Sequence, residues 1–446
     1  MQENDLTLKP VATLLRQLSV PISIGYIFYT LFNVVDTFFA GMISTEALAA
    51  LSISFPVFFL VISVSAGITT GSTAVISHAL GAGDKQAAMR FAAQSISYAI
   101  LASLMLTVVG LLLSESMFRL LGADDSMLEI ALAYMDIIFI GAASFVIAGV
   151  LNSILTAQGQ TKPYRNFLIL SFFLNLIFDP WFLFGGFGVP ALGIKGIALA
   201  TILIESIGVV YLFKHALSTG LLCRECLSML VPQRTAYWAL SAQSVPACFN
   251  MLTIAIGIFV RMYFVADFGE EAIAAYGIGV RTEQLVLLPT LGLNMATLAI
   301  VGQNKGAGLF DRVLKTWKTA IYYSLIVTQC GAFLLLVFAK QFILIFSNDP
   351  AVLNFGSGYL FIAALSLSAY GLMFVSINAL QGFHRPVFPL IVGVVRQAIL
   401  PLVLIPLSLL WFSGSIFGVW WALFGIIWVS TLVTVWFTWN VLRVDN

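Results

Sequence analysis

Long apolar stretches recur along the whole chain and limit the folds open to it. Each has about 20–30 residues, which is enough for one α-helix to cross the hydrocarbon core of a bilayer. Because no water is available there to bond the backbone amides, such a stretch is expected to fold as a helix. Twelve spans are predicted: residues 21–42, 48–77, 88–113, 128–157, 166–184, 193–215, 237–266, 272–303, 313–338, 352–381, 387–411 and 416–442.

The composition supports this class of fold. Hydrophobic residues make up 60% of the chain and charged residues 9%, whereas about a quarter of the residues in a soluble domain are charged. We therefore expect an all-α integral membrane protein. A net charge of +1 gives no reason to expect a nucleic-acid partner. The sequence has no Walker loop, Rossmann fingerprint or HExxH motif, so neither an enzyme nor a cofactor is predicted.

The second half of the chain repeats the first. Because the offset of 225 residues contains six predicted spans, an even number, the halves have the same orientation and a pseudo-twofold axis along the membrane normal, as in many transporters. We predict an N-lobe of residues 1–215, a linker of residues 216–236 and a C-lobe of residues 237–446. The matching pairs are Val20-Pro21 with Val245-Pro246, Glu46 with Glu271, Gly67 with Gly292, and Gly81-Ala82-Gly83 with Gly306-Ala307-Gly308.

Lysine and arginine positions predict the orientation. If the N-terminus is cytoplasmic, the outer loops hold only Arg119, Lys195 and Lys340, and most other basic residues fall in cytoplasmic segments. Positive charge accumulates on the cytoplasmic side of membrane proteins. Both termini and the linker are therefore expected in the cytoplasm.

An aspartate inside the first span is the main candidate for a functional residue. A carboxylate at membrane depth costs about 2.5–3.5 kcal/mol on insertion scales, so it is rare and usually functional. Asp36 lies about six residues from the outer end of its span, and Asp179 lies about five from the outer end of the fifth span. With a rise of about 1.5 Å per residue, both fall roughly 8–12 Å below the outer edge.

Other polar side chains fall near the same depth. Asn175 precedes Asp179 by four residues, hence on one helix face, and Thr201 precedes Glu205 by four. Glu205 and Asn152 are candidates for the wall of a substrate cavity. The predicted proton or sodium site consists of Asp36, Asn175, Asp179 and Thr201.

Basic residues inside the predicted spans leave an alternative open. Arg261, Arg281 and Arg396 belong to the second half, and pairing of one of them with Asp36 would make that aspartate structural. Arg281 and Glu283 are also candidates for a buried pair of their own. In the repeat Asp36 aligns with Arg261, so the acidic site is expected in the first half only.

Two prolines are candidate bending points. A helical pattern begins near residue 13, so Pro21 is expected inside a helix, where proline causes a kink. Pro180 follows Asp179 directly and removes a backbone donor, which loosens the local backbone and frees a carbonyl for a cation.

This combination of features resembles the multidrug and toxic compound extrusion (MATE) transporters. They are two six-helix halves, an aspartate late in the first span, and a QGxxxP turn at residues 158–163 and 381–386. The NxxxDP sequence at residues 175–180 is similar to the DinF-like bacterial branch. The resemblance implies a V-shaped pair of lobes in a bacterial inner membrane that exports small cationic, lipophilic drugs and works as a monomer. It also implies that the four polar residues form the N-lobe ion site and that Pro21 is the bending point of the first helix.

The predicted function is multidrug antiport. Protonation of Asp36 from the outside is expected to bend the first helix at Pro21 and to shrink the N-lobe cavity, so that the drug leaves. Sodium would suit the same oxygen atoms, although a proton is favoured. The alternative is a lipid-linked saccharide flippase of the same architecture, for which Arg261, Arg281 and Arg396 would supply cationic cavity residues.

Overall fold

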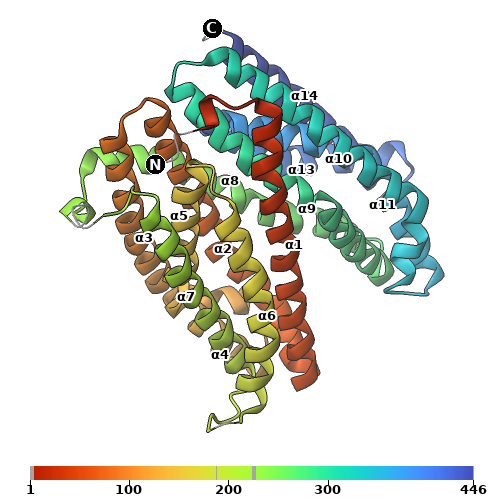
Figure 1. Ribbon diagram of the computed structural model, residues 1–446. Coiled ribbons are helices and arrows are strands. Elements are labelled where there is room, and N and C mark those ends of the chain that lie inside the picture. The colour runs from red at the N-terminus through yellow and green to blue at the C-terminus, as the bar shows by residue number, and fades with distance from the viewer. Residues whose placement is uncertain (1–4, 187, 224–227, 445–446) are drawn as a thin grey trace. The chain divides into compact units, whose positions relative to one another are not determined.

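The computed structural model describes residues 5–186, 188–223 and 228–444, and these form a bundle of long helices (Figure 1). Residues 224–227 of the predicted linker lie outside the described residues. A short 3-10 turn, η1 (Asp5–Thr7), precedes the first long helix. The helices are α1 (Val11–Ile43), α2 (Thr45–Gly81), α3 (Lys85–Leu120), α4 (Asp125–Ile140), α5 (Ala142–Ala157), α6 (Lys162–Phe184), α7 (Ile194–Ser218), α8 (Arg234–Ala266), α9 (Glu270–Gly306), α10 (Phe310–Leu344), α11 (Pro350–Gly382), α12 (Val387–Val394), α13 (Leu400–Trp411) and α14 (Ile416–Val444).

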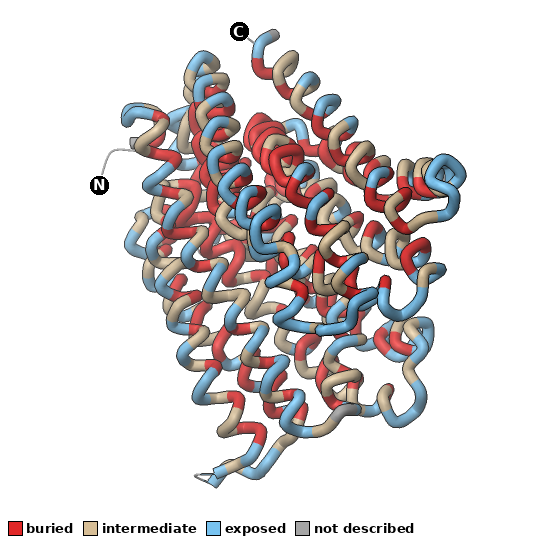
Figure 2. The backbone as a smooth tube through the Cα atoms, turned by 90° about the vertical axis from the view of Figure 1, so that its right-hand side faces the viewer, coloured by how far each residue is buried: buried red, intermediate tan, exposed pale blue. Residues whose placement is uncertain are grey.

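Twelve membrane spans are confirmed within the described residues. Eleven helical segments are long and apolar enough to cross a bilayer, and the bent pair α4 and α5 supplies the twelfth span. One of the eleven, Val387–Trp411, combines α12, a π-helical turn η3 (Val395–Ile399) and α13. Figure 2 shows buried and exposed residues alternating along many helices. Many of the exposed side chains are large and apolar, as on α3, which is what a lipid-facing surface requires.

The fourth span is not the single helix predicted for residues 128–157. It breaks at Gly141 into two helices bent by 44°. A side chain at Gly141 would overlap Ile202 of α7, so only glycine fits there. The hydroxyl of Thr107 donates to the Phe139 carbonyl (2.6 Å), and that of Ser144 donates to the Gly141 carbonyl (2.7 Å). These side chains bond carbonyls at the break, which makes it tolerable inside a membrane.

The chain packs as two compact units, and the division does not follow the lobe boundaries predicted at residues 215 and 237. The first-half unit spans Ile24–Cys248, and the second-half unit consists of the residues up to Ser23 together with those from Phe249 onward. The beginning of α1 therefore packs with the second half, and the beginning of α8 packs with the first half. Both helices pass between units two residues beyond a proline, Pro21 or Pro246.

Close helix contacts explain this exchange. In the second-half unit, a Cβ added to Gly292 of α9 would overlap the carbonyl of Ser19 on α1 and would lie 2.8 Å from the amide nitrogen of Ser23. The Ser23 hydroxyl also donates to the Pro289 carbonyl of α9 (2.8 Å). Small residues allow such close backbone approach between membrane helices. The contact fixes the first half of α1 against α9.

The first-half unit has the equivalent contact. A Cβ added to Gly67 of α2 would lie 2.5 Å from the amide nitrogen of Cys248 on α8, and one added to Gly71 would lie 2.7 Å from that of Ser244. Gly67 and Cys248 are the counterparts of Gly292 and Ser23 at the offset of 225 residues. The repeat seen in the sequence therefore extends to equivalent helix contacts.

The segments before α1 and α8 are each held by side chains of the unit they join. Before α1, Arg312 donates to the Lys9 carbonyl (2.8 Å) and Asn304 to the Leu6 carbonyl (3.2 Å). Before α8, the buried Gln94 of α3 donates to the carbonyls of Met229 and Val231 and accepts from the Gln233 amide (2.9 Å). Each anchor fixes the polar chain at the start of an exchanged helix. These anchored residues are Leu6 and Lys9 before α1, and Met229, Val231 and Gln233 before α8.

Candidate functional site

The predicted acidic residues lie where α1 packs against α6 in the first-half unit (Figure 1). The rings of Phe28 on α1 and Phe172 on α6 have centroids 5.6 Å apart. Lower on the interface, a Cβ on Gly25 would lie 2.9 Å from the Leu168 side chain, so the helices are close. Asp36 follows on α1 about three turns after Gly25, which brings it beside the second half of α6.

The structure brings Asp36, Asn175 and Asp179 together. The amide of Asn175 donates to Asp36 Oδ1 at 2.8 Å. The carboxyl groups of Asp36 and Asp179 are close enough to interact electrostatically and, when one is protonated, to share a hydrogen bond. Asp36 is 7% exposed, and Asn175 and Asp179 are fully buried. Their depth in the sequence predicted this proximity, whereas their ion-binding role stays a prediction.

Several oxygen atoms of this group have no donor. Among the described residues, neither carboxylate oxygen of Asp179 nor the Asn175 Oδ1 atom has a hydrogen-bond partner. No salt bridge in the described part of the chain reaches either aspartate. Two carboxylates cannot both remain ionised in a buried site without a cation, because desolvation and mutual repulsion both oppose it. The arrangement therefore requires a proton or a metal cation.

The arginine alternative for Asp36 is wrong, because its printed partner is the amide of Asn175. Arg261 instead donates to Gln397 (3.2 Å) in the second-half unit. The proposed pair of Arg281 and Glu283 is also wrong. Arg281 is exposed, and Glu283 is buried and accepts a hydrogen bond from Tyr359. Two residues apart on a helix, the side chains leave on different faces.

Tyrosines surround the acidic group, and the sequence interpretation missed them. Tyr134 of α4, which is 5% exposed, lies within electrostatic range of both Asp36 and Asp179. Tyr29 of α1 interacts electrostatically with Glu205 as well as with Asp36. A sequence signal existed for the second of these. Tyr26, Tyr29, Asn33 and Asp36 recur at helical spacing and so form one polar stripe on α1.

The remaining predicted residues make other contacts. Thr201 of α7 is buried, and its hydroxyl donates to the Ile197 carbonyl of its own helix (3.0 Å). Glu205, one turn further, is buried near Tyr29, and no printed hydrogen bond involves it. Asn152 of α5 accepts from the Thr156 hydroxyl (3.1 Å). None of the three donates to or accepts from Asp36 or Asp179 in the described part of the chain.

Both predicted bending prolines lie inside helices. α1 begins at Val11, so Pro21 is interior, as the pattern before the first span predicted. Pro21 deprives the Gln17 carbonyl of its usual amide donor. α6 continues through Pro180 to Phe184 without a break. Whether either helix bends during function stays a prediction.

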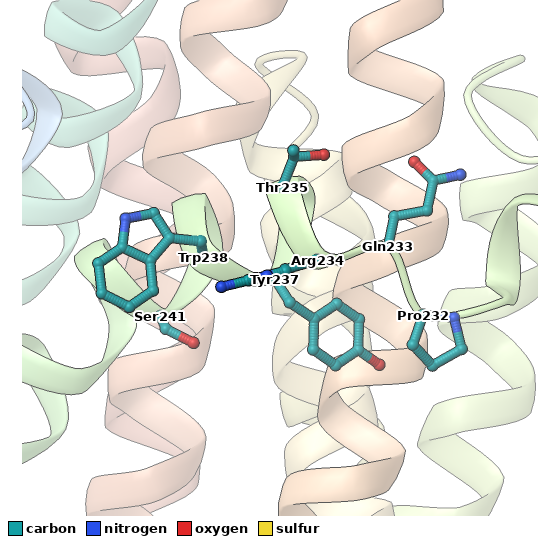
Figure 3. A pocket seen from close by; sticks show the side chains of 7 residues that line it. All are labelled: Pro232, Gln233, Arg234, Thr235, Tyr237, Trp238 and Ser241. Carbon is teal, nitrogen blue, oxygen red and sulfur yellow. The ribbon is translucent and has the colours of Figure 1, made fainter.

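A surface hollow of about 780 Å³ lies apart from the acidic group, at the start of α8 (Figure 3). The indole of Trp238 is largely exposed beside it. Tryptophan and arginine near a helix end are typical of the interface between bilayer and water. No predicted site residue lines this hollow, so it is not a candidate for the ion site. It is lined by Pro232, Gln233, Arg234, Thr235, Tyr237, Trp238 and Ser241.

Comparison with known proteins places the chain in a family of transporters. The family model MatE matches residues 21–181 and 246–407, one segment in each half, and the two segments begin 225 residues apart. A FAD transporter of Shewanella oneidensis is 28% identical over 407 residues, which cover 90% of this chain and 88% of that protein. A probable multidrug resistance protein NorM of Thermotoga maritima is 27% identical over 423 residues, 91% of this chain and 87% of the relative. A solved structure of a MOP superfamily transporter from Pyrococcus furiosus has a TM-score of 0.92 at 22% identity, and the match covers 100% of this chain and 99% of that one.

Proposed function

Because the chain belongs to the MatE family of membrane transporters, we propose that it is a secondary active exporter of small organic molecules. The driving force in this proposal is an inward flow of protons, or of sodium ions, across a bacterial inner membrane. Both termini lie in the cytoplasm in this scheme, and the protein works as a monomer. The buried pair of Asp36 and Asp179, without a basic partner, is the observation that carries the proposal.

The pair supports coupling because its charge depends on what binds. When both carboxyl groups are ionised, they attract a cation or a positively charged substrate. A bound proton removes one charge and satisfies an oxygen atom that otherwise lacks a donor. A proton needs only these two side chains, whereas a sodium ion also needs further oxygen ligands, such as Asn175 Oδ1. This difference favours the proton.

The surroundings of the pair support cationic, lipophilic substrates. Aromatic rings line the same helix interface, with Phe28 next to Phe172 and Phe173. Negative charge beside aromatic faces attracts organic cations through Coulombic and cation–π contacts. Glu205 and Asn152 are proposed as further polar contacts of such a substrate.

Helix α1 offers a route from protonation to movement. Its residues 11–23 are held by α9, whereas residues 24–43 carry Asp36 along α6. Pro21 lies just before the transition, where a missing amide donor makes bending easier. We propose that protonated Asp36 exchanges its partners, that α1 bends near Pro21, and that the substrate site of the first-half unit shrinks.

A second candidate substrate comes from the Shewanella relative, which is named a FAD transporter. FAD carries phosphate groups, so its export would require a basic contact in place of an acidic one. The flippase alternative has no support from the two named relatives. Flavin released into the medium by expressing cells, compared with cells lacking the protein, tests the FAD candidate.

Proteoliposomes with an imposed ion gradient test the proposed function. Ethidium movement driven by a proton gradient at constant sodium is the expected result for the wild-type protein. The Asp36→Asn variant should fold, as judged by a single symmetric peak in gel filtration, but should show no gradient-driven transport. Wild-type transport by Asp36→Asn would refute the proposed coupling. Transport that follows sodium and ignores the proton gradient would retain the site and change the ion.

A further inference from the structure

The second-half unit contains a buried basic cluster where the first-half unit has its acidic group. Arg261 lies on α8, the repeat equivalent of α1, and Arg396 lies on the π-helical turn of the span equivalent to α6. The two guanidinium groups are near enough to repel each other electrostatically. Arg396 is only 8% exposed, and Arg261 is half-buried. Within the repeat, the polarity of this helix pair is thus inverted.

Neither arginine is neutralised by an acid at contact distance. No salt bridge in the described part of the chain joins Arg261 or Arg396 to Glu283, the acidic residue that interacts with both at longer range. Glu283 instead accepts the Tyr359 hydroxyl. Arg261 has a single printed hydrogen bond, to the neutral amide oxygen of Gln397. Arg396 lies over the Tyr370 ring at 5.9 Å, a cation–π contact that leaves its donors free.

The Nε atoms of both arginines are buried and lack an acceptor among the described residues. A buried guanidinium is normally paired, because loss of its hydration is costly. Here the cluster carries two positive charges when Glu283 is protonated and one when it is ionised. The missing partner is therefore an anion with several acceptor oxygens.

The local backbone is adapted to present Arg396. In an α-helix the amide of residue 401 would bond the Gln397 carbonyl, but Pro401 has no amide hydrogen. The chain forms the π turn Val395–Ile399 just before it, and single π turns within α-helices are frequent at functional sites. Gly257 of α8 lies directly against the Gln397 side chain, so no larger residue separates α8 from the turn. Arg261 and Arg396 are thereby brought to one place.

We propose that Arg261 and Arg396 bind the phosphate group of a phosphate ester. A phosphate monoester carries about −1.5 to −2 charges near neutral pH, which matches the one or two uncompensated charges of the cluster. Guanidinium groups bind phosphate oxygens with paired hydrogen bonds. The bound molecule is either a soluble organic phosphate or a lipid headgroup. The site goes beyond the proposed export of cations and belongs to the other unit, so either proposal can fail without the other.

Two flavins that differ by one phosphate give the sharpest test. Riboflavin and riboflavin 5′-phosphate have the same fluorescent ring system, and only the second carries the anion. Binding to the purified full-length protein is measured by fluorescence polarisation. The phosphate ester should bind and riboflavin should bind at least about tenfold more weakly, since hydrogen bonds to charged groups contribute about 1.5–3 kcal/mol. Equal binding of the two flavins would overturn the proposal.

Variants then assign the binding to the cluster. Arg396→Gln and Arg261→Gln should each weaken riboflavin 5′-phosphate binding, whereas Arg396→Lys, which keeps the charge without the planar fork, should lose less. Arg281→Gln is the matched control, because Arg281 is exposed in the same unit and outside the cluster. If Arg396→Gln does not fold, Arg396→Lys and Arg261→Gln still decide the matter. Unchanged binding in the folded cluster variants, or equal loss in Arg281→Gln, would refute the assignment.

A competition experiment separates the two sources of phosphate. Phosphatidylglycerol is added to the protein with bound riboflavin 5′-phosphate, and phosphatidylcholine is added in a parallel sample. Displacement by phosphatidylglycerol alone identifies an anionic lipid headgroup as the occupant. Retention of the flavin with both lipids identifies a soluble phosphate ester. Both results require the arginine cluster, and the cluster variants must remove the signal in either case.

Discussion

Replacing Gly292 with alanine would place a methyl group where α9 touches the first half of α1. The added carbon atom would overlap the Ser19 carbonyl and the Ser23 hydroxyl and would lie 2.8 Å from the Ser23 amide nitrogen. Two of these three atoms belong to the backbone, so rotation of a side chain cannot relieve the clash. α1 must move away from α9, and the bond from Ser23 to the Pro289 carbonyl is lost.

The expected cost follows from three contributions. Overpacking at such a contact costs about 1–3 kcal/mol, and the lost hydrogen bond costs about 0.5–1.5 kcal/mol. Alanine gains back nearly 1 kcal/mol of helix propensity over glycine. Gly292→Ala should therefore be destabilised by about 1–3 kcal/mol. The same substitution at Gly277, which lies in α9 with open space around its Cβ position, should stabilise the protein by up to about 1 kcal/mol.

Denaturation by sodium dodecyl sulfate in mixed micelles, followed by tryptophan fluorescence, measures both variants against the wild type. The two glycines share a helix, so the difference between them isolates the contact with α1. Gly292→Ala should also reduce ethidium transport, because the fixed half of α1 is displaced. If Gly292→Ala and Gly277→Ala are equally stable, α1 does not approach α9 at this glycine, and the packing described above is incorrect.

Three further substitutions test other parts of the structure. Asp179→Asn should abolish gradient-driven dye transport in proteoliposomes as Asp36→Asn does; retained transport would exclude Asp179 from the coupling site. Pro21→Ala should slow transport while leaving equilibrium dye binding unchanged, because restoring an amide donor stiffens α1; unchanged rates would remove Pro21 from the mechanism. Gln94→Ala deletes three hydrogen bonds to the chain before α8, which should cost about 2–4 kcal/mol and speed limited proteolysis of the linker, residues 216–236; equal proteolysis would show that Gln94 does not hold it.

Hydropathy and the repeat were sufficient to predict the twelve spans and the parallel relation of the halves. Both depend on average composition and on register, which a single sequence records directly. Helix depth was sufficient to bring Asp36 near Asn175 and Asp179, because side chains at one depth on neighbouring helices tend to meet. The break at Gly141 could not be predicted in this way. It depends on Ile202 of a different helix, and the apolar pattern continues through it.

The errors have a common physical origin, since hydropathy does not define which way a helix face points. Arg281 and Glu283 are close in sequence and lie on different faces, so they were wrongly suggested as a pair. Tyr134 entered the acidic site from α4, which the sequence had not connected with it. The unit boundaries near Ser23 and Cys248 arise from glycine contacts between distant segments, whereas the polar linker had suggested a division between 215 and 237.

During synthesis, the first-half unit cannot be completed by the first six spans. The glycine surface of α2 at Gly67 and Gly71 is covered by residues of α8, which leave the ribosome only after the linker. Until then, that surface remains open to lipid, to insertion machinery or to a second copy of the chain. A polypeptide cut within the linker would therefore yield an N-terminal piece without the last helix segment of its own core, while carrying at its start a segment that belongs to the other unit.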